Sequence, residues 1–271
     1  EPDRDYMIPA AGRLPEAPAL IDRGGYFVVH APRQTGKTTT LRALAREVNT
    51  QGRYACLYVS CKAAEPAASD VREAQLAILG QILQRAEKNL PLPLRPPQPF
   101  PEASDLLLLS SALRAWALAC PLPIVLFFDE IDTLTGLALR SVLAQLHSGF
   151  PERPKEAPWS VLLCGLRDVR DYREAAGKDP ERFGSASPFN IKVKSVRLGN
   201  FSETDVARLY AQHQADTGQV FEDAAIKRAY TWTCGQPWLV NALANEVIGE
   251  TKISEPLITP EHIDRAKERL V

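Results

Sequence analysis

The sequence lacks the cysteine patterns and long apolar runs of disulfide-stabilised and membrane-spanning proteins. Its 271 residues include five cysteines, an odd number with no C-x-x-C pair, which argues against a disulfide framework and a zinc site. The longest apolar runs, such as Leu106–Leu109 and Ile124–Phe128, are far shorter than the ~20 residues of a membrane span. Four of the cysteines stand among apolar residues, which predicts buried thiols in a reducing cytoplasm.

The sequence also lacks an excess of charge of either sign. It has 32 Lys and Arg against 33 Asp and Glu, for a net charge of −1. This balance excludes a strongly basic nucleic-acid binder, and binding to DNA would need a local basic surface that composition does not support.

The chain is long enough for two domains at ~150 residues each. Alternating strand and helix patterns occupy residues 1–199, whereas residues 200–271 contain only helical patterns. We therefore expect an α/β domain over 1–199, with a three-layer sheet of five mainly parallel strands, and a helical lid domain over 200–271. The expected strands are Tyr26–His30, Tyr54–Ser60, Ile124–Phe128, Ser160–Cys164 and Ile191–Leu198. Ile124–Phe128 is continuously apolar, which is typical of a central parallel strand.

Other segments suggest connections. Glu1–Asp22 reads as an irregular lead-in, and Ser104 is expected to cap a helix that ends near Ala119. Pro91–Pro101 is rich in proline and should be extended, either as a stiff connection or as a partner-binding segment. Because the chain begins at Glu1 and ends within a charged helix, we expect it to be trimmed or part of a longer protein.

A phosphate-binding motif follows the first strand. Ala31–Thr38 matches the pattern G-x-x-x-x-G-K-[ST] except at its first glycine, where Ala31 stands. In such a loop backbone N–H groups and the start of the next helix surround phosphate oxygens, a lysine lies near the β- and γ-phosphates, and a hydroxyl binds Mg²⁺. The alternative is an ordinary strand–helix turn. The residues expected around ATP or ADP are Ala31, Pro32, Arg33, Gln34, Thr35, Gly36, Lys37, Thr38 and Thr39.

Two carboxylates end the most apolar strand. Asp129 is expected to hold Mg²⁺ opposite Thr38, and Glu130 to act as a general base toward water. A strand that simply ends in a charged turn is the alternative, but the joint presence of the phosphate loop favours a nucleotide site. Glu130 favours hydrolysis over phosphate transfer to another acceptor.

Together these motifs resemble the AAA+ ATPases and the related signal-transduction ATPases with numerous domains, of the additional-strand class. The resemblance implies that one strand separates the phosphate-loop strand from the Asp129 strand. It also implies that Arg167, after the fourth strand, senses the γ-phosphate; the alternative is a surface ion pair with Asp168 or Asp171. Gly235-Gln236-Pro237 is similar to a Gly-x-Pro motif whose proline, here Pro237, packs on the base. The structural interpretation is a helix–helix turn, in which Gly ends one helix and Pro begins the next, and both can hold together. The lead-in residues Tyr6, Ile8 and Pro9 either cover the adenine or tether the segment to the core.

Three functions remain open at this point. The first is a Mg²⁺-dependent ATPase acting as a switch or motor, with Glu130, Lys37 and Arg167 as catalytic residues. The second is a regulatory scaffold that holds nucleotide with little turnover. The third is a DNA-associated ATPase similar to origin-binding or transposition ATPases. A homo-oligomer or protein partner is expected to engage regions outside this chain.

Overall fold

The structure, a computed structural model, describes residues 6–67, 69–166, 194–251 and 256–270. Its contacts divide the chain into two compact units. The larger unit comprises Leu14–Pro32 and Thr38–Arg197; the smaller comprises Glu1–Arg13, Arg33–Lys37 and Leu198–Val271. The boundary near residue 199 that the sequence suggests stays a prediction.

The larger unit is built on a five-stranded parallel sheet with the order β2-β3-β4-β1-β5. The described strands are β1 (Tyr26–His30), β2 (Ala55–Ser60), β3 (Ile124–Asp129), β4 (Ser160–Gly165) and β5 (Ser195–Arg197). Every residue of β3 and β4 is buried, as a continuously apolar central strand requires. β4 lies between β1 and β3, which is the order that the resemblance implied.

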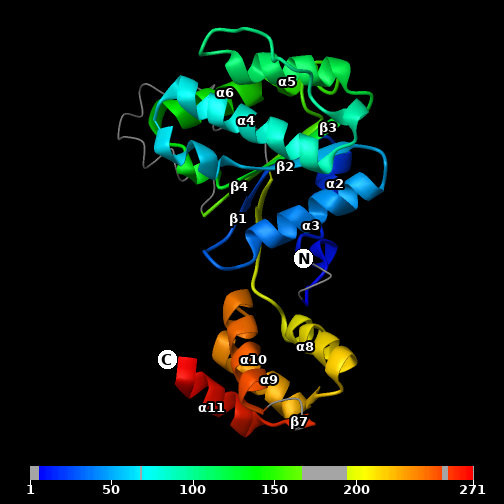
Figure 1. Cartoon of the computed structure of the whole chain (residues 1–271), viewed down its shortest axis with the longest axis vertical. Coiled ribbons are helices and arrows are strands. Elements are labelled where there is room, and N and C mark those ends of the chain that lie inside the picture. Colours follow the sequence, from blue (N-terminus) through cyan, green and yellow to red (C-terminus); the bar gives the residue numbers. More distant parts are fainter. Residues whose placement is uncertain (1–5, 68, 167–193, 252–255, 271) are drawn as a thin grey trace. The chain divides into compact units, whose positions relative to one another are not determined.

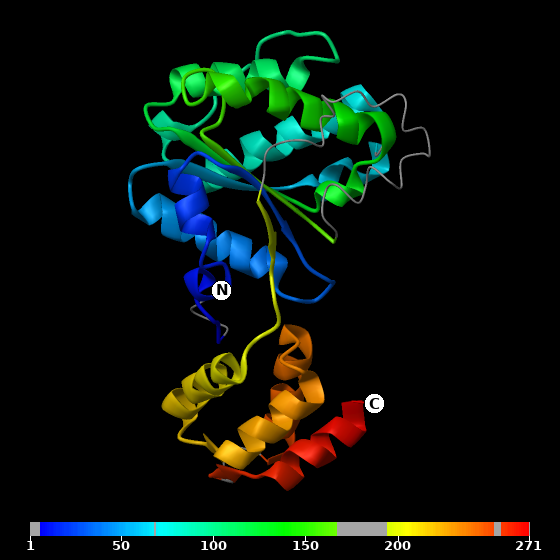
Figure 2. The ribbon, with the colours of Figure 1, turned by 180° about the vertical axis from the view of Figure 1, so that it is seen from behind.

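Helices cover both faces of this sheet (Figures 1 and 2). One face carries α4 (Val71–Asn89), α5 (Leu108–Ala119) and α6 (Gly136–Gly149), and the other carries α2 (Ala17–Asp22) and α3 (Lys37–Thr50). On the first face Leu57, Leu126 and Leu163 from neighbouring strands share one apolar cluster with Trp116. The three-layer α/β fold predicted from the sequence is therefore confirmed.

Two buried glutamines organise the start of α5. The amide oxygen of Gln75 accepts from the Leu109 N–H at 3.0 Å, and that of Gln145 accepts from the Ser110 N–H at 2.9 Å. The Gln145 amide nitrogen in turn donates to the Gln75 oxygen at 2.8 Å. The first N–H groups of a helix have no partner within the helix. These side chains from α4 and α6 therefore cap the N-terminus of α5.

The predicted cap at Ser104 is wrong for this reason. Ser104 accepts from the Leu107 N–H in a turn, and α5 begins only at Leu108. The lead-in is also less irregular than expected, since it contains α1 (Ala10–Arg13) and α2. Pro18 fits the first turn of α2, where a missing N–H is harmless.

Short connecting helices refine other expectations. The proline-rich connection contains one 3₁₀ turn, η2 (Leu92–Leu94), between residues with extended backbone. Further 3₁₀ turns are η1 (Cys61–Ala67), η3 (Ile131–Thr133) and η4 (Phe150–Glu152). The predicted strand Ile191–Leu198 is observed as β5, while residues 191–193 lie outside the described residues.

The smaller unit is mainly helical, with α8 (Glu203–Thr217), α9 (Asp223–Thr233), α10 (Pro237–Thr251) and α11 (Pro260–Leu270). It also contains a short parallel pair, β6 (Val220–Phe221) and β7 (Leu257–Ile258), so the prediction of helices alone is wrong there. Phe221 is buried and lies in β6. Both strands have only two residues, too few for an alternating pattern to be visible.

The N-terminal segment belongs to the core of this smaller unit. Ile8 is 7% exposed and packs with the buried residues of α8 to α11. The Met7 N–H donates to the Gln212 side-chain oxygen at 3.0 Å, and the Gln212 amide returns a bond to the Met7 carbonyl. The Tyr6 ring meets His213 edge-on. These contacts support the tether interpretation of the lead-in.

Within the described ranges, no helix has the length and apolar character needed to cross a membrane. Cys56, Cys61 and Cys164 are buried, whereas Cys120 is half-buried and Cys234 is exposed. Burial raises the pKa of the Cys56 and Cys61 thiols well above the ordinary range, which keeps both protonated at neutral pH.

Replacing Gln75 by Met should destabilise the larger unit. The change leaves the Leu109 N–H buried without a partner, so we expect the free energy of unfolding to fall by about 1–3 kcal/mol. Urea unfolding followed by circular dichroism measures this. The matched control is Gln84→Met on the exposed side of α4, where a change of less than about 0.5 kcal/mol is expected. Equal urea midpoints for the two variants would contradict the capping role.

Candidate nucleotide-binding site

The phosphate loop joins the end of β1 to the start of α3. Lys37 is the first residue of α3, so the loop delivers it and Thr38 to a helix N-terminus, where backbone N–H groups and the helix dipole favour anions. Among described non-glycine residues a positive φ occurs only at Gln34, Glu130 and Cys234. Ala31 is therefore not in a left-handed conformation, and alanine in place of the first glycine of the motif carries no backbone strain of that kind.

The conformation of the loop is set further along the chain. Gln34 has φ 61° and Gly36 has φ 78°, and such left-handed residues make consecutive N–H groups converge on an anion. Thr35 between them is 2% exposed. Pro32, Arg33, Gln34 and Thr39 are exposed, and Lys37 and Thr38 are half-buried. All the residues expected to surround the phosphates thus lie in one loop and the first turn of α3.

Asp129 is the most deeply buried ionisable group of the predicted site, at 0% exposure. Its Oδ2 accepts hydrogen bonds from the Thr38 hydroxyl at 2.6 Å and the Tyr58 hydroxyl at 2.9 Å. Its Oδ1 accepts from the Glu130 N–H at 2.9 Å. The sequence predicted Thr38 and Asp129 as partners, and the larger unit brings them into direct contact.

Tyr58 is a residue that the sequence analysis missed. Burial, and next the nearby Asp129 carboxylate, raise the pKa of its hydroxyl well above the ordinary range. The phenol therefore stays protonated at all physiological pH values and remains a donor to the carboxylate. A signal for it existed, because Tyr58 lies near the carboxyl end of a strand parallel to β3, and such ends meet at one edge of the sheet.

The oxygen atoms of Thr38 and Asp129 fit a magnesium ion. A hydroxyl and a carboxylate are hard ligands, which Mg²⁺ prefers. Within the described part of the chain there is no cluster of three or more His, Cys, Asp or Glu side chains that would hold a metal by itself. Mg²⁺ usually takes one or two protein ligands and completes its shell with water and phosphate oxygens, so this sparse donor set suits a metal that arrives with nucleotide.

Glu130 lies just beyond the end of β3, with φ 57° and ψ 38°. The Ser60 hydroxyl donates to the Glu130 Oε2 at 2.7 Å, and Ser60 is the residue of β2 that pairs with Asp129 across the sheet. Ser60 was also missed by the sequence analysis, and its hydroxyl fixes the position of the Glu130 carboxylate.

The end of β4 adjoins the segment after β3. The Asp132 carboxylate accepts from the Leu166 N–H at 3.3 Å, and a Cβ on Gly165 would stand 3.2 Å from the same carboxylate. The Ala31 N–H donates to the Gly165 carbonyl at 3.3 Å. The end of β4 is thus bonded both to the end of the phosphate-loop strand and, through Leu166, to the segment after β3. Arg167, the expected sensor, lies outside the described residues.

The Gly-Gln-Pro motif begins α10 in the smaller unit. Gly235 has φ 68°, and a Cβ there would overlap the Phe201 carbonyl, so only glycine fits. Pro237 is the buried first residue of α10, a position that suits proline because its missing N–H has no helical partner. The structural interpretation of this motif is confirmed, while the contact of Pro237 with a base stays a prediction.

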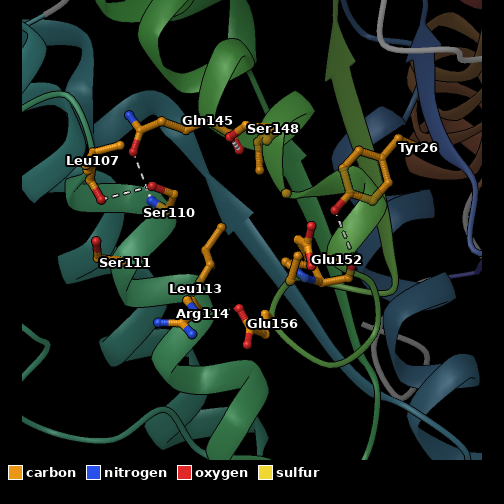
Figure 3. Close-up of a pocket in the computed structure, with 14 residues that line it drawn as sticks. Tyr26, Leu107, Ser110, Ser111, Leu113, Arg114, Gln145, Ser148, Glu152 and Glu156 are labelled. Atoms are coloured by element: carbon orange, nitrogen blue, oxygen red, sulfur yellow. Dashed lines mark hydrogen bonds and ion pairs between the residues drawn. The ribbon is translucent and has the colours of Figure 1, made fainter.

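A separate hollow in the larger unit contains none of the predicted site residues (Figure 3). It has a volume of about 250 Å³ and is lined by α5, α6 and the loop before β4. Some of its polar groups already have partners: the Ser110 hydroxyl donates to the Leu107 carbonyl at 3.0 Å and the Tyr26 hydroxyl to the Pro158 carbonyl at 2.9 Å. Arg114 at its rim pairs with Glu156 at 2.7 Å. The phosphate loop therefore remains the candidate site.

Replacing Tyr58 by Phe should lower the free energy of unfolding of the larger unit, because it removes a hydrogen bond to Asp129. The buried carboxylate would lose one donor, and a hydrogen bond to a charged group is worth about 1.5–3 kcal/mol. Thermal unfolding measures the loss, with Tyr54→Phe as the control, because the Tyr54 hydroxyl bonds Asp22 at an exposed position. The contact with Asp129 is unimportant if both variants melt at the same temperature.

Solved structures share this fold at low sequence identity. The Walker-type ATPase PABY2304 of Pyrococcus abyssi matches with a TM-score of 0.62 and 16% identity over 96% of this chain and 71% of that one. The RuvB Holliday junction branch migration motor of Thermotoga maritima gives 0.56 and 15% over 96% and 68%. Cdc6p from Pyrobaculum aerophilum gives 0.58 and 14% over 96% and 65%.

At these identities the likeness concerns the fold. A search of the curated proteins found no significant match. A family model described as an AAA domain matches residues 21–172, which is more than half of the chain. The matched region contains the phosphate loop, Asp129 and Glu130. The chain therefore belongs to the AAA family of P-loop ATPases.

Proposed function

We propose that this chain binds ATP and ADP at the phosphate loop and hydrolyses ATP with Mg²⁺. The observation that carries the proposal is the direct hydrogen bond, 2.6 Å long, between the Thr38 hydroxyl and the buried Asp129 carboxylate. This hydrogen bond joins the phosphate loop motif to the Asp129-Glu130 pair, which lie far apart in the chain. A strand that merely ended in a charged turn would give no reason for that contact.

The residues divide the work by their chemistry. The loop amides and Lys37 bind the phosphates, and Thr38 and Asp129 hold the metal. When bound, Mg²⁺ supplies positive charge to the phosphate oxygens. Glu130 accepts a proton from water as the water oxygen attacks the γ-phosphorus and the bond to the bridging β–γ oxygen breaks. ADP and inorganic phosphate are the products.

Finer assignments follow from the same proposal. Arg167 senses the γ-phosphate, and Pro237 packs on the base. The position of β4 between β1 and β3 and the Gly235-Gln236-Pro237 turn support membership of the additional-strand, signal-transduction class. Residues 1–199 form the ATPase domain and residues 200–271 form the helical lid. ATP and ADP favour different arrangements of these two domains, as in a molecular switch. The buried thiols agree with a reducing cytoplasm.

A second candidate function is a regulatory module that retains nucleotide with little turnover. The Ser60–Glu130 hydrogen bond favours it, because a carboxylate engaged with β2 is less available to water. The two candidates differ in rate and share the same site.

Replacing Glu130 by Gln separates the chemistry from binding. The amide cannot accept a proton, so we expect ATP turnover to fall by about 10²–10⁴-fold, with ADP affinity changed by less than about threefold. Phosphate release and calorimetric titration measure the two quantities. Glu152→Gln, on the rim of the separate hollow, is the matched control and should leave both unchanged. A wild type that binds ADP but shows no turnover above Glu130→Gln would refute hydrolysis and leave the retention module.

Replacing Ser60 by Ala tests the retention module. Freed from a hydrogen bond worth about 0.5–1.5 kcal/mol, Glu130 should reach water more often, and basal turnover should rise roughly two- to tenfold. Ser110→Ala serves as the control, because among the contacts described its hydroxyl bonds only the Leu107 carbonyl, away from the phosphate loop. An unchanged or lower turnover in Ser60→Ala would show that the bond does not restrain Glu130.

A further inference from the structure

Arg13 makes contacts that none of the sequence motifs anticipates. From α1 in the smaller unit, its Nη1 donates to the Thr35 carbonyl at 2.9 Å and its Nη2 to the Gly199 carbonyl at 2.7 Å. The guanidinium also lies over the Phe201 ring, 4.7 Å from its centre. Burial lowers the pKa of Arg13 to about 10, so the group is still charged at neutral pH and both hydrogen bonds are charge-assisted.

Gln236 makes a similar contact with the neighbouring peptide group. Its amide nitrogen donates to the Gln34 carbonyl at 3.3 Å, while its side-chain oxygen accepts from the Leu239 N–H at 2.6 Å. The second bond caps the first turn of α10. One side chain therefore links the start of a helix to the phosphate loop, within the same unit.

These two carbonyls determine where two loop N–H groups point. In a planar trans peptide the carbonyl of one residue and the N–H of the next point in opposite directions, and no peptide of the loop is cis. The donor on the Gln34 carbonyl therefore directs the Thr35 N–H away from Gln236. By the same geometry, the donor on the Thr35 carbonyl directs the Gly36 N–H away from Arg13.

Gly36 is adapted to the same arrangement. A Cβ at this position would stand 3.0 Å from the Arg13 Nη1, and the φ of 78° disfavours any side chain. The guanidinium thus lies against the one loop residue that has no side chain. Its charge is directed at the outer, carbonyl side of the loop.

We propose that Arg13 and Gln236 are positioning residues for phosphate binding: by holding the carbonyls of Thr35 and Gln34 from outside, they aim the N–H groups of Gly36 and Thr35 at the nucleotide diphosphate. The inference rests on the proposed nucleotide binding at this loop. It also gives the middle residue of the Gly-Gln-Pro motif a task of its own.

The first test replaces Arg13 in the full chain and measures ADP and AMP affinity in the presence of Mg²⁺. Arg13→Met keeps an apolar stem over Phe201 but removes both donors, and Arg13→Lys keeps the charge with a single donor group. We expect ADP affinity to fall about tenfold or more in Arg13→Met and less in Arg13→Lys. AMP, measured by competition at millimolar concentration, lacks the β-phosphate and should lose less affinity than ADP.

Arg72→Met is the matched control. Arg72 forms an exposed ion pair with Asp105 in the larger unit, so its loss should change neither affinity by more than about twofold. A wild type that binds no ADP would refute the proposed function itself. If the wild type binds ADP, two results for Arg13→Met would overturn only the positioning role. One is an unchanged ADP affinity, and the other is a loss of affinity by the same factor for ADP and AMP.

The second test separates the cap from the loop contact at Gln236. Gln236→Glu retains an acceptor for the Leu239 N–H but replaces the donor to the Gln34 carbonyl by an oxygen. We expect an unchanged melting temperature together with a fivefold or greater loss of ADP affinity, which is equivalent to about 1 kcal/mol of binding free energy. Gln236→Ala should lose both stability and affinity. Full ADP affinity in Gln236→Glu overturns the proposal for this residue even where Arg13→Met fails to fold.

Discussion

The buried carboxylate of Asp129 is the constraint on which the site depends. A charge removed from water is costly unless hydrogen bonds replace its hydration, and the side chain of Asp129 is fully buried. Its donors come from three places: the first turn of α3, the strand β2 and the residue that follows β3. Meeting them requires that β2 pair with β3 and that the phosphate loop end beside them. The strand order of the sheet, with β2 beside β3, thus supplies the hydrogen bonds that the buried Asp129 carboxylate needs.

Backbone strain in the described chain falls within or beside the motifs that the sequence predicts. The non-glycine residues with positive φ in the described chain are Gln34, Glu130 and Cys234. They lie in the phosphate loop, at the proposed general base and immediately before the Gly-Gln-Pro motif. A left-handed backbone costs an L-residue about 1–2 kcal/mol, and such strain persists where the surrounding structure over-determines it. At Gln34 and Glu130 the contacts from Gln236 and Ser60 provide part of that surrounding structure.

The sequence predicted the sheet well and the helix starts less well. β3 and β4 were recognisable because strands buried on both faces are continuously apolar. The start of α5 was misplaced at Ser104 because its caps, Gln75 and Gln145, come from other helices. β6 and β7 escaped because two-residue strands carry no periodicity. Sequence patterns therefore predicted the elements that are specified by residues within the same segment.

The same distinction applies to the site. The sequence by itself determined the phosphate loop and the Asp129-Glu130 pair, because the spacing of residues along the chain defines both motifs. Only the tertiary structure decided that Thr38 bonds Asp129, that Tyr58 and Ser60 complete the carboxylate contacts, and that Arg13 and Gln236 hold the loop carbonyls. The physical reason is that a hydrogen bond depends on distance and direction in space. Neither is visible in residues separated by tens or hundreds of positions in the chain.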